Sequence, residues 1–418
     1  MRHFSKSSTK ALVALVVALI VCSNLGLAHE GDSSGSKTQL DNRLTAATSR
    51  FAFKLYDQIL KRRRGKNTFV SPASVMMALA MTYNGADGTT REAMSRTLEI
   101  EGMSLDDVNR AFADLKSALA PTDPKIQIKI ANSVWARNGF AIKPAFLQRN
   151  KQYYAAEIAS LNFADPTAPE TINAWVKRNT EGKIDKIVDG AIGDDVVLFL
   201  INATYFKGQW QVEFKKAQTK PDTFRLTGGE RKQLSMMSQS GNYLYYKGKN
   251  FQSVVLPYGK GSVSMYVLLP DEQTSLDQFE QDLTPENWDM WMKNFGFTPG
   301  DVMLPRFKVE WESSLKEALK ALGMAEAFDP GRADFSLIAE PQLGNRLFIS
   351  QVKHKTFCEV NEEGTEAAAV TSVVGSVTSV QQPRERFSMK VDRPFFFAIR
   401  DNLTGVLLFM GSVTNPAV

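Results

Sequence analysis

One stretch constrains the fold more than any other. Residues 196–210, VVLFLINATYFKGQW, open as a continuous apolar run rich in β-branched side chains. A run of this kind is typical of a strand whose two faces are both covered. Such a strand needs packing layers on either side of its sheet. With 418 residues and 43% hydrophobic composition, the chain can supply them as one large domain or two smaller ones.

The rest of the chain predicts early helices and later strands. Apolar residues at three- and four-residue steps predict a helix over 44–64, and Ser71-Pro72 begins a strongly apolar helix that Asn84-Gly85 ends. Further patterns predict helices at 105–119, 172–184 and 315–324, and strands at 126–137, 242–248, 251–272, 301–312 and 351–360. Residues 394–401 and 405–413 predict a final hairpin. Neither repeats nor linkers divide this part, so we expect one α+β domain.

The first 28 residues have the pattern of a secretory signal peptide. Basic residues precede the apolar run ALVALVVALIV, which is too short to span a bilayer, and Gly26-Leu27-Ala28 is a small-x-small cleavage site. An uncleaved anchor and a lipoprotein attached through Cys22 are the alternatives. We therefore expect a signal peptide at 1–28, a flexible leader at 29–43 and the folded domain at 44–418, with a secreted product that no membrane segment retains.

The composition excludes several classes of function. A net charge of +5 is too small and too dispersed to indicate a nucleic-acid binder. The sequence shows neither zinc-ligand spacing nor a phosphate-binding glycine motif, so we expect no metal and no cofactor. A histidine-dependent enzyme would have to use His354, since His3 and His29 fall in the signal and the leader. On the predicted strand His354 and Cys358 lie roughly 13 Å apart and cannot form a catalytic dyad. On a helix they could.

The segment NEEGTEAAAVTSVVGSVTSVQQPRERFSMK, residues 361–390, is unusually rich in small residues. From Thr365 the side chains alternate between two faces, and Glu366 is the only charge as far as Ser376. Proline is absent from Gly364 to Gln382, so every backbone N–H is available for strand pairing. Such a run of small residues is unusual next to so many strand-forming segments.

Several segments in this order resemble the serpin family, over essentially all of the chain from about Leu44 to Pro416. They are FVSPASV, YNGADGTT, LINATYFKGQW, LPRFKVEWESSLKEALKALGM, VNEEGTEAAA and VDRPFFFAIRDNLTGVLLFMGSVTNP. The resemblance implies three β-sheets, eight or nine helices and an exposed reactive loop at about 362–388. In inhibitory serpins a protease cleaves this loop, which then inserts into the main sheet and carries the acylated protease with it.

The resemblance also implies site residues. Family spacing places the reactive bond at Thr378-Ser379, or one residue earlier at Val377-Thr378. The hinge corresponds to Glu362, Glu363, Gly364, Thr365, Glu366, Ala367, Ala368, Ala369 and Val370, the last bulkier than usual. Ser71, Ser74, Asn202 and His354 resemble a buried polar cluster beneath the main sheet. Trp210, Thr223, Arg306 and Glu362 match the top of the sheet, where the loop enters.

These residues favour one function over another. The intact hinge predicts an irreversible inhibitor that forms a covalent complex with a target serine protease and has no catalytic residues of its own. Thr or Val before the reactive bond suits a shallow, elastase-like pocket. Subtilisin-like or cysteine proteases remain alternative targets. The alternative function is that of a non-inhibitory binding or chaperone serpin. We expect a monomer.

Overall fold

The computed structural model describes residues 40–416 apart from 64, 121, 341–345 and 366–384. The predicted signal peptide, and the predicted leader up to residue 39, lie outside the described residues. What is described belongs to one compact unit, Gln39–Val418. Its first helix begins at Asn42, two residues before the predicted start of the folded domain.

The described residues form nine α-helices. α1, α2 and α4 match the predicted patterns closely, whereas α3, α5, α7 and α8 were not predicted. The bounds are α1 Asn42–Arg63, α2 Pro72–Tyr83, α3 Gly88–Thr97, α4 Leu105–Ala118, α5 Pro144–Tyr154, α6 Ala168–Asn179, α7 Leu276–Glu280, α8 Pro285–Lys293 and α9 Lys316–Leu319. Short irregular helical turns occur at Lys216–Gln218 and between Lys320 and Phe328.

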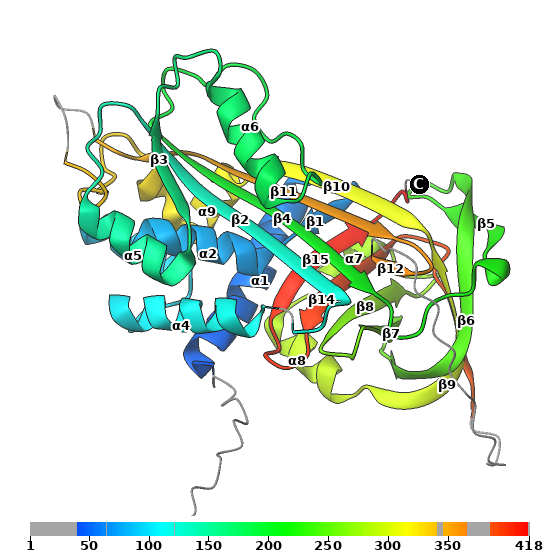
Figure 1. The fold of residues 1–418 in the computed structure, drawn as a ribbon. Helices are drawn as coiled ribbons and strands as arrows, with labels where there is room; N and C mark the ends of the chain where they lie inside the picture. The colour runs from blue at the N-terminus through cyan, green and yellow to red at the C-terminus, as the bar shows by residue number, and fades with distance from the viewer. Residues whose placement is uncertain (1–39, 64, 121, 341–345, 366–384, 417–418) are drawn as a thin grey trace, which may run out of the picture. The chain divides into compact units, whose positions relative to one another are not determined.

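Six strands form the sheet that carries the candidate site. Their order across the sheet is β10-β11-β12-β4-β2-β3, and β11 also pairs with β4. Their bounds are β2 Ile126–Arg137, β3 Glu157–Leu161, β4 Leu198–Gln209, β10 Phe307–Ser314, β11 Ile349–Val360 and β12 Gly364–Thr365. In Figure 1 these strands run side by side, with α6 over one face and α2 with its neighbouring helices over the other.

β4 is the strand that the apolar run predicted, and it is covered on both faces. Its alternate side chains enter two different cores: Leu198 and Leu200 pack in the main core, while Phe199 and Ile201 pack with residues of α6. Neither face of β4 meets water, and every residue from Leu198 to Phe206 is buried.

A second network contains nine strands in the order β1-β15-β14-β8-β7-β6-β9-β13, with β5 attached to β6. Its bounds are β1 Thr68–Val70, β5 Lys220–Arg225, β6 Arg231–Lys247, β7 Phe251–Tyr258, β8 Val263–Pro270, β9 Gly296–Pro305, β13 Phe387–Lys390, β14 Phe395–Asp401 and β15 Leu407–Val413. Hydrogen bonding thus connects the described strands as two sheets, one of six strands and one of nine, where the serpin resemblance implied three. The reason is the long strand β6, which pairs with β5 near Met236 and with β7 near Tyr245.

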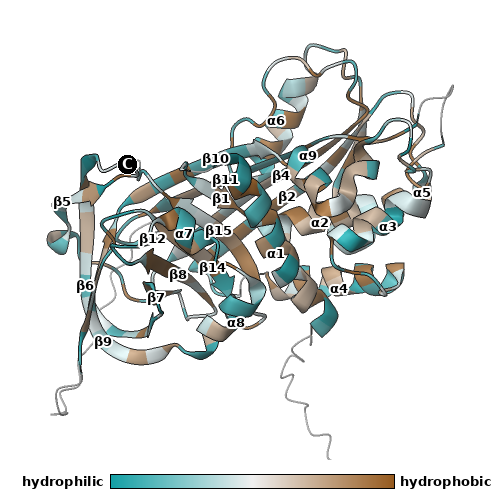
Figure 2. Cartoon of the chain, turned by 180° about the vertical axis from the view of Figure 1, so that it is seen from behind, coloured by the Kyte–Doolittle hydropathy of each residue, from teal (hydrophilic) through white to brown (hydrophobic). Residues whose placement is uncertain are grey.

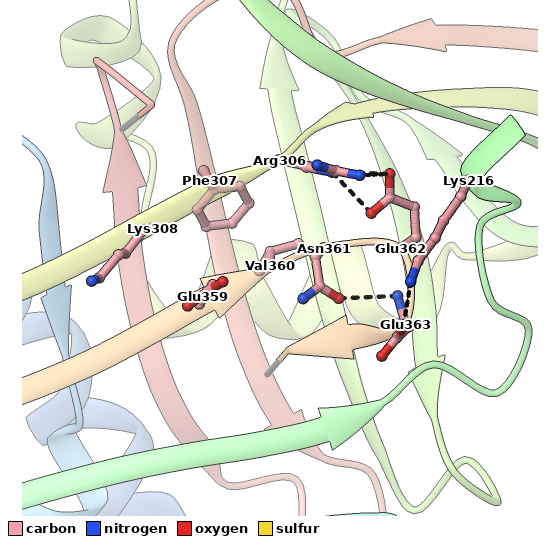
Figure 3. A pocket seen from close by; sticks show the side chains of 9 residues that line it. All are labelled: Lys216, Arg306, Phe307, Lys308, Glu359, Val360, Asn361, Glu362 and Glu363. Atoms are coloured by element: carbon pink, nitrogen blue, oxygen red, sulfur yellow. Dashed lines mark hydrogen bonds and ion pairs between the residues drawn. The ribbon is translucent and has the colours of Figure 1, made fainter. Parts of the chain in front are cut away.

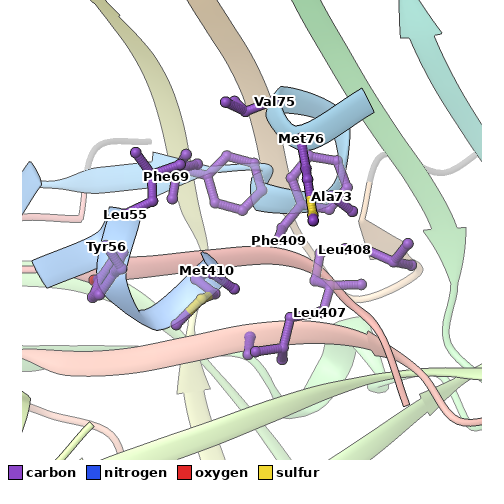
Figure 4. Close-up of a cluster of buried hydrophobic side chains, with 14 of the residues drawn as sticks. Leu55, Tyr56, Phe69, Ala73, Val75, Met76, Leu407, Leu408, Phe409 and Met410 are labelled. Carbon is purple, nitrogen blue, oxygen red and sulfur yellow. The ribbon is translucent and has the colours of Figure 1, made fainter. Parts of the chain in front are cut away.

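The core gathers around α2, whose residues are all buried, as its sequence predicted. Figure 4 shows Ala73 and Met76 of α2 above the apolar side chains of β15. Phe69 stacks on Phe409 with ring centroids 4.9 Å apart, which joins β1 to the final hairpin. In Figure 2 the hydrophobic colour accordingly concentrates on α2 and β8, while α1 and α8 carry hydrophilic colour. None of the described helices is long and apolar enough to cross a membrane.

Candidate functional site

The site lies where β11 ends and the chain turns back toward the sheet. Residues 361–364 form the turn, in which Asn361 N donates to Gly364 O at 2.8 Å. The Asn361 side chain also accepts hydrogen bonds from the backbone N–H groups of Glu363 and Gly364. Asparagine commonly closes turns in this way. The turn directs Gly364 and Thr365 between β11 and β4.

β12 therefore occupies one end of the sheet between two longer strands. It runs antiparallel to both, with Thr365 opposite Val360 of β11 and Gly208 of β4. Farther along the sheet β11 and β4 pair directly and in parallel, from Ile349 opposite Leu198 to Phe357 opposite Tyr205. The two strands thus separate only where β12 lies between them.

Gly364 is required by its surroundings. Its φ is 149°, and a Cβ atom at this position would lie 2.0 Å from the carbonyl oxygen of Gly208. A side chain would force the backbone of β12 away from β4, because neither strand can give way at that distance. The hinge implied by the serpin resemblance includes Gly364, and this close approach is the physical reason for a glycine there.

Thr365 faces the interior, as its place in the alternating pattern predicted. It is fully buried, and its hydroxyl shares a 2.6 Å hydrogen bond with the Tyr258 hydroxyl. Tyr258 in turn stacks on Trp210, with ring centroids 4.4 Å apart and planes 11° from parallel. The first inward-facing residue of the segment is therefore held by a polar contact inside an aromatic pocket.

Glu362 anchors the turn to the neighbouring strand. Its side chain is only 2% exposed and receives hydrogen bonds from Arg306 Nε at 2.9 Å and Arg306 Nη2 at 2.6 Å. Thr219 donates a further hydrogen bond to Glu362 at 2.5 Å. Burial by itself raises the pKa of Glu362, but the bonds from Arg306 and Thr219 outweigh it and lower the pKa. Figure 3 shows the carboxylate and the guanidinium pointing at each other.

A second, more exposed set of contacts fixes the outer side of the turn. Lys216 Nζ lies 2.6 Å from Glu363 Oε1. Trp210 donates from its backbone to Glu363 O and from its indole to Asn361 O, both at 2.9 Å. Arg306, Glu362 and Lys216 also line a cavity of about 280 Å³ beside the turn. We call Trp210, Lys216, Thr219, Arg306, Asn361 and Glu362 the entry cluster.

The structure brings together three of the four residues predicted at the top of the sheet. Arg306 binds Glu362, and Trp210 binds the backbone on either side of Glu362. Thr223 instead lies on β5, where it accepts a hydrogen bond from Gln233. The threonine that contacts Glu362 is Thr219, four residues earlier. The predicted Thr223 therefore lies outside this cluster, because it is on β5 itself, whereas Thr219 precedes β5 and reaches Glu362. Lys216 and Asn361 were missed, although Asn361 before two glutamates and a glycine was a usable turn signal.

The predicted polar cluster is present beneath the sheet. Ser71 N donates to His354 Nε2 at 3.0 Å, and Ser71 Oγ donates to Leu408 O at 2.7 Å. Asn202, which lies opposite His354 in the sheet, donates to Ser74. All four predicted residues are buried. They join α2 to β4, β11 and β15 at the level where β11 and β4 pair directly.

His354 and Cys358 do not form a catalytic pair. Both lie on β11, as the strand prediction required, and both are fully buried. Burial lowers the pKa of His354 to about 3 and raises the pKa of the Cys358 thiol. A neutral imidazole that accepts from Ser71 and a protonated thiol on the same strand are structural groups.

Part of the predicted site cannot be placed. Glu366, Ala367, Ala368, Ala369 and Val370 of the hinge lie outside the described residues. Val377, Thr378 and Ser379, which carry the two alternatives for the reactive bond, also lie outside them. Among the described residues, no group of histidine, cysteine or acidic side chains could hold a metal ion.

Comparison with known proteins identifies the class of protein that this fold and site define. The family model described as serpin (serine protease inhibitor) matches residues 46–416, so the chain belongs to the serpin family. The human leukocyte elastase inhibitor is 36% identical over 386 residues, which are 90% of this chain and all of that protein. Mouse glia-derived nexin is 34% identical over 377 residues, 88% of this chain and 92% of that protein.

Solved structures agree with the family. The native state of tengpin, a thermophilic serpin, has a TM-score of 0.83 and 36% identity, covering 91% of this chain and 96% of that chain. A complex of thyroxine-binding globulin with thyroxine has a TM-score of 0.79 and 26% identity, covering 90% and 100%. The α+β serpin fold expected from the sequence is confirmed.

Proposed function

We propose that this serpin is an irreversible suicide-substrate inhibitor of serine proteases. A protease would attack the reactive loop, form an acyl-enzyme and be carried along as the loop enters the sheet between β11 and β4. The serpin would supply a bait bond and a metastable fold, while the nucleophile and base belong to the protease. The single observation that carries the proposal is the position of β12, whose two residues, Gly364 and Thr365, already lie between these strands.

The direction of the strands supports the same mechanism. β10 and β11 are antiparallel, as are β4 and β2, whereas β11 and β4 are parallel. A strand continuing from β12 would replace this parallel pair with two antiparallel pairs. Antiparallel pairing is slightly more stable per residue, and the new strand adds a full ladder of hydrogen bonds. Insertion would therefore lower the free energy of the molecule.

For the target we propose an elastase-like serine protease. Support comes from the small, β-branched residues Val377 and Thr378 before the alternative reactive bonds. The resemblance to leukocyte elastase inhibitors is consistent with this choice. The preferred bond is Thr378-Ser379, and subtilisin-like and cysteine proteases are the other candidates.

We further propose that the chain is exported as a monomer after removal of residues 1–28. The charged start, apolar run and small-residue cleavage site support this, and the family match begins only at residue 46. N-terminal sequencing of the protein recovered from its native source tests it. A first residue near His29 is expected, and an intact Met1 would contradict it.

The test of inhibition is a denaturing gel of the purified protein mixed with an elastase. We expect a covalent complex that survives boiling, together with a released peptide that begins at Ser379 by mass spectrometry. A peptide that begins at Thr378 would select the alternative bond. A complex with a subtilisin but not with an elastase would change only the target class.

The competing function is that of a non-inhibitory binding or chaperone serpin. Cleavage of the loop with neither a covalent complex nor a gain in heat stability would support it and overturn the proposal. A catalytically inactive protease, with its nucleophilic serine replaced by alanine, is the matched control, because it can bind the loop but cannot become acylated.

A further inference from the structure

An apolar pocket lies beside the entry cluster and shares Trp210 with it. Its cavity of about 220 Å³ is lined by buried Trp210, Phe214 and Tyr243 and by the exposed side chains of Val212 and Phe297. We call these five residues the side pocket. Val212 is 55% exposed and Phe297 is 66% exposed. Large apolar side chains that stand together around a hollow are a feature of binding surfaces.

The side pocket is held open by its own hydrogen bonds. Gln239 Nε2 donates to Val212 O at 3.1 Å and to Glu213 O at 2.9 Å, which ties the rim to β6. The Tyr243 hydroxyl donates to Gln239 Oε1 at 2.9 Å. These bonds fix the rim and one wall relative to each other, so a ligand would find the pocket already formed.

We propose that the side pocket binds valine side chains of residues 366–384 in the uncleaved protein. Described residues on either side of that segment contact residues that line the pocket. At the start, Glu363 O accepts from Trp210 N at 2.9 Å, just before the segment begins. At the end, Phe387 lies edge-on against Tyr243 with ring centroids 5.9 Å apart. The described residues before and after the segment thus contact two different residues of the side pocket.

Length and composition also fit this occupant. Residues 366–384 could span on the order of 60 Å when extended, so they can reach a pocket between their own attachment points. Five of them are valines, at 370, 373, 374, 377 and 380, and Glu366 and Arg384 are the only charges. Burying a valine side chain in a preformed apolar pocket is favourable. A bound valine would keep the reactive bond close to the body of the molecule and compete with its presentation to a protease.

This inference does not depend on the inhibitor proposal, and its test avoids serine proteases. Thermolysin, a metalloprotease that forms no acyl-enzyme, would report how accessible the segment is. In the variant Val212→Glu/Phe297→Glu we expect cleavage within 366–384 to be about tenfold faster than in the parent. The control is Leu403→Glu, since Leu403 is 68% exposed on the turn between β14 and β15. Unchanged heat stability would show that each variant is folded.

A second measurement keeps the test decisive. In a variant with all five valines replaced by serine, we expect hydrogen exchange to become faster at residues 212–214 and 241–244. Equal cleavage rates and equal exchange would overturn the proposal. Two other results would also overturn it. Slow hydrogen exchange at residues 212–214 and 241–244 that disappears on dilution would identify a second copy of the chain as the occupant. Slow exchange that is lost on deletion of residues 29–39 would identify the leader as the occupant.

Discussion

At the scale of single residues, Glu362 anchors the turn that leads from β11 into β12. It is a nearly buried carboxylate that forms an ion pair with the partly exposed guanidinium of Arg306 and accepts a hydrogen bond from the hydroxyl of Thr219. Its backbone oxygen also accepts from Phe214 N at 2.9 Å. The turn and β12 follow directly from Glu362, and β12 pairs with both β11 and β4. A substitution at Glu362 therefore affects both of these strands.

We predict that Glu362→Lys loosens the top of the sheet and promotes polymers. The substitution places a cation beside Arg306 and removes the acceptor of Thr219, so β12 loses its anchor. The loop of one molecule could then add to the sheet of the next. After mild heating, a native gel should show ladders for Glu362→Lys but a monomer for Glu101→Lys, which makes the same charge change at an exposed turn. A monomeric Glu362→Lys protein would count against this role.

We predict a second residue effect through His354. Its folded-state pKa of about 3 lies below the unfolded value of about 6.5, so acid protonates the unfolded chain first. The group's contribution to stability is therefore present above about pH 6.5 and declines as the pH falls toward 3. Between pH 7.5 and pH 5 this loss amounts to about 2 kcal/mol.

The measurement is the urea midpoint of the native form at both pH values. The parent should lose more stability than His354→Gln, because glutamine does not titrate in this range. Other groups titrate in both proteins, so the difference between the two losses isolates His354. An equal loss in both proteins would show that His354 does not contribute.

At this scale the sequence predicted site residues that belong to a local sequence pattern. It missed site residues whose contacts depend on how distant parts of the chain come together. Gly364, Glu362 and Arg306 lie inside segments that resemble the serpin family, VNEEGTEAAA and LPRFKVEWESSLKEALKALGM, so their positions could be predicted. Thr219 and Thr223 fall in one short stretch, and only the path of the chain after Trp210 decides which of them reaches Glu362. Lys216 is one of many lysines, and its partner Glu363 is distant in the sequence.

At the scale of elements, β12 is short, but it defines the direction of a longer strand. Thr365 faces the core and is buried. If the segment continues in the same alternation, Ala367, Ala369 and Thr371 follow it inward, and Ala368, Val370 and Ser372 face outward. The two faces therefore make opposite demands on a large charged side chain.

We predict that Thr371→Arg blocks inhibition and that Ser372→Arg largely preserves it. An arginine on the inward face would have to be buried without a partner, which stalls insertion, whereas an outward arginine stays in water. With an elastase, Thr371→Arg should be cleaved as a substrate with little covalent complex. The neighbouring Ser372→Arg is the control, and equal complex yields from both would exclude this register.

The elements that the sequence predicted best are those with one uninterrupted pattern. β4, α2 and the β14–β15 hairpin are rich in apolar residues and buried over almost their whole length, so their apolar runs alone predicted them. β6 was only partly predicted, because its 17 residues change partners along the strand and its burial pattern changes with them. α7 spans Leu276–Glu280 only, too short to show a helical period.

At the scale of the whole molecule, the proposed mechanism requires that the uncleaved form is not the most stable arrangement of the chain. Its persistence would then be kinetic. We predict that cleavage within 366–384, by any protease, raises the melting temperature by about 10 °C or more as the new strand joins the sheet. Calorimetry of intact and cleaved protein measures this directly. The variant Thr371→Arg should show a smaller rise, and no rise in either protein would exclude a metastable native state.

The turn at 361–364 has a consequence for how fast such a rearrangement can proceed. It connects β11 to β12 as a tight hairpin, so a growing strand would add each residue beside the one already paired. No long loop has to be closed at any step, and the entropic barrier of bringing distant segments together is largely absent. Hairpin zippering occurs on the microsecond scale. The rate should therefore be set by the peeling apart of β11 and β4, and thus by the side chains of the polar cluster beneath them.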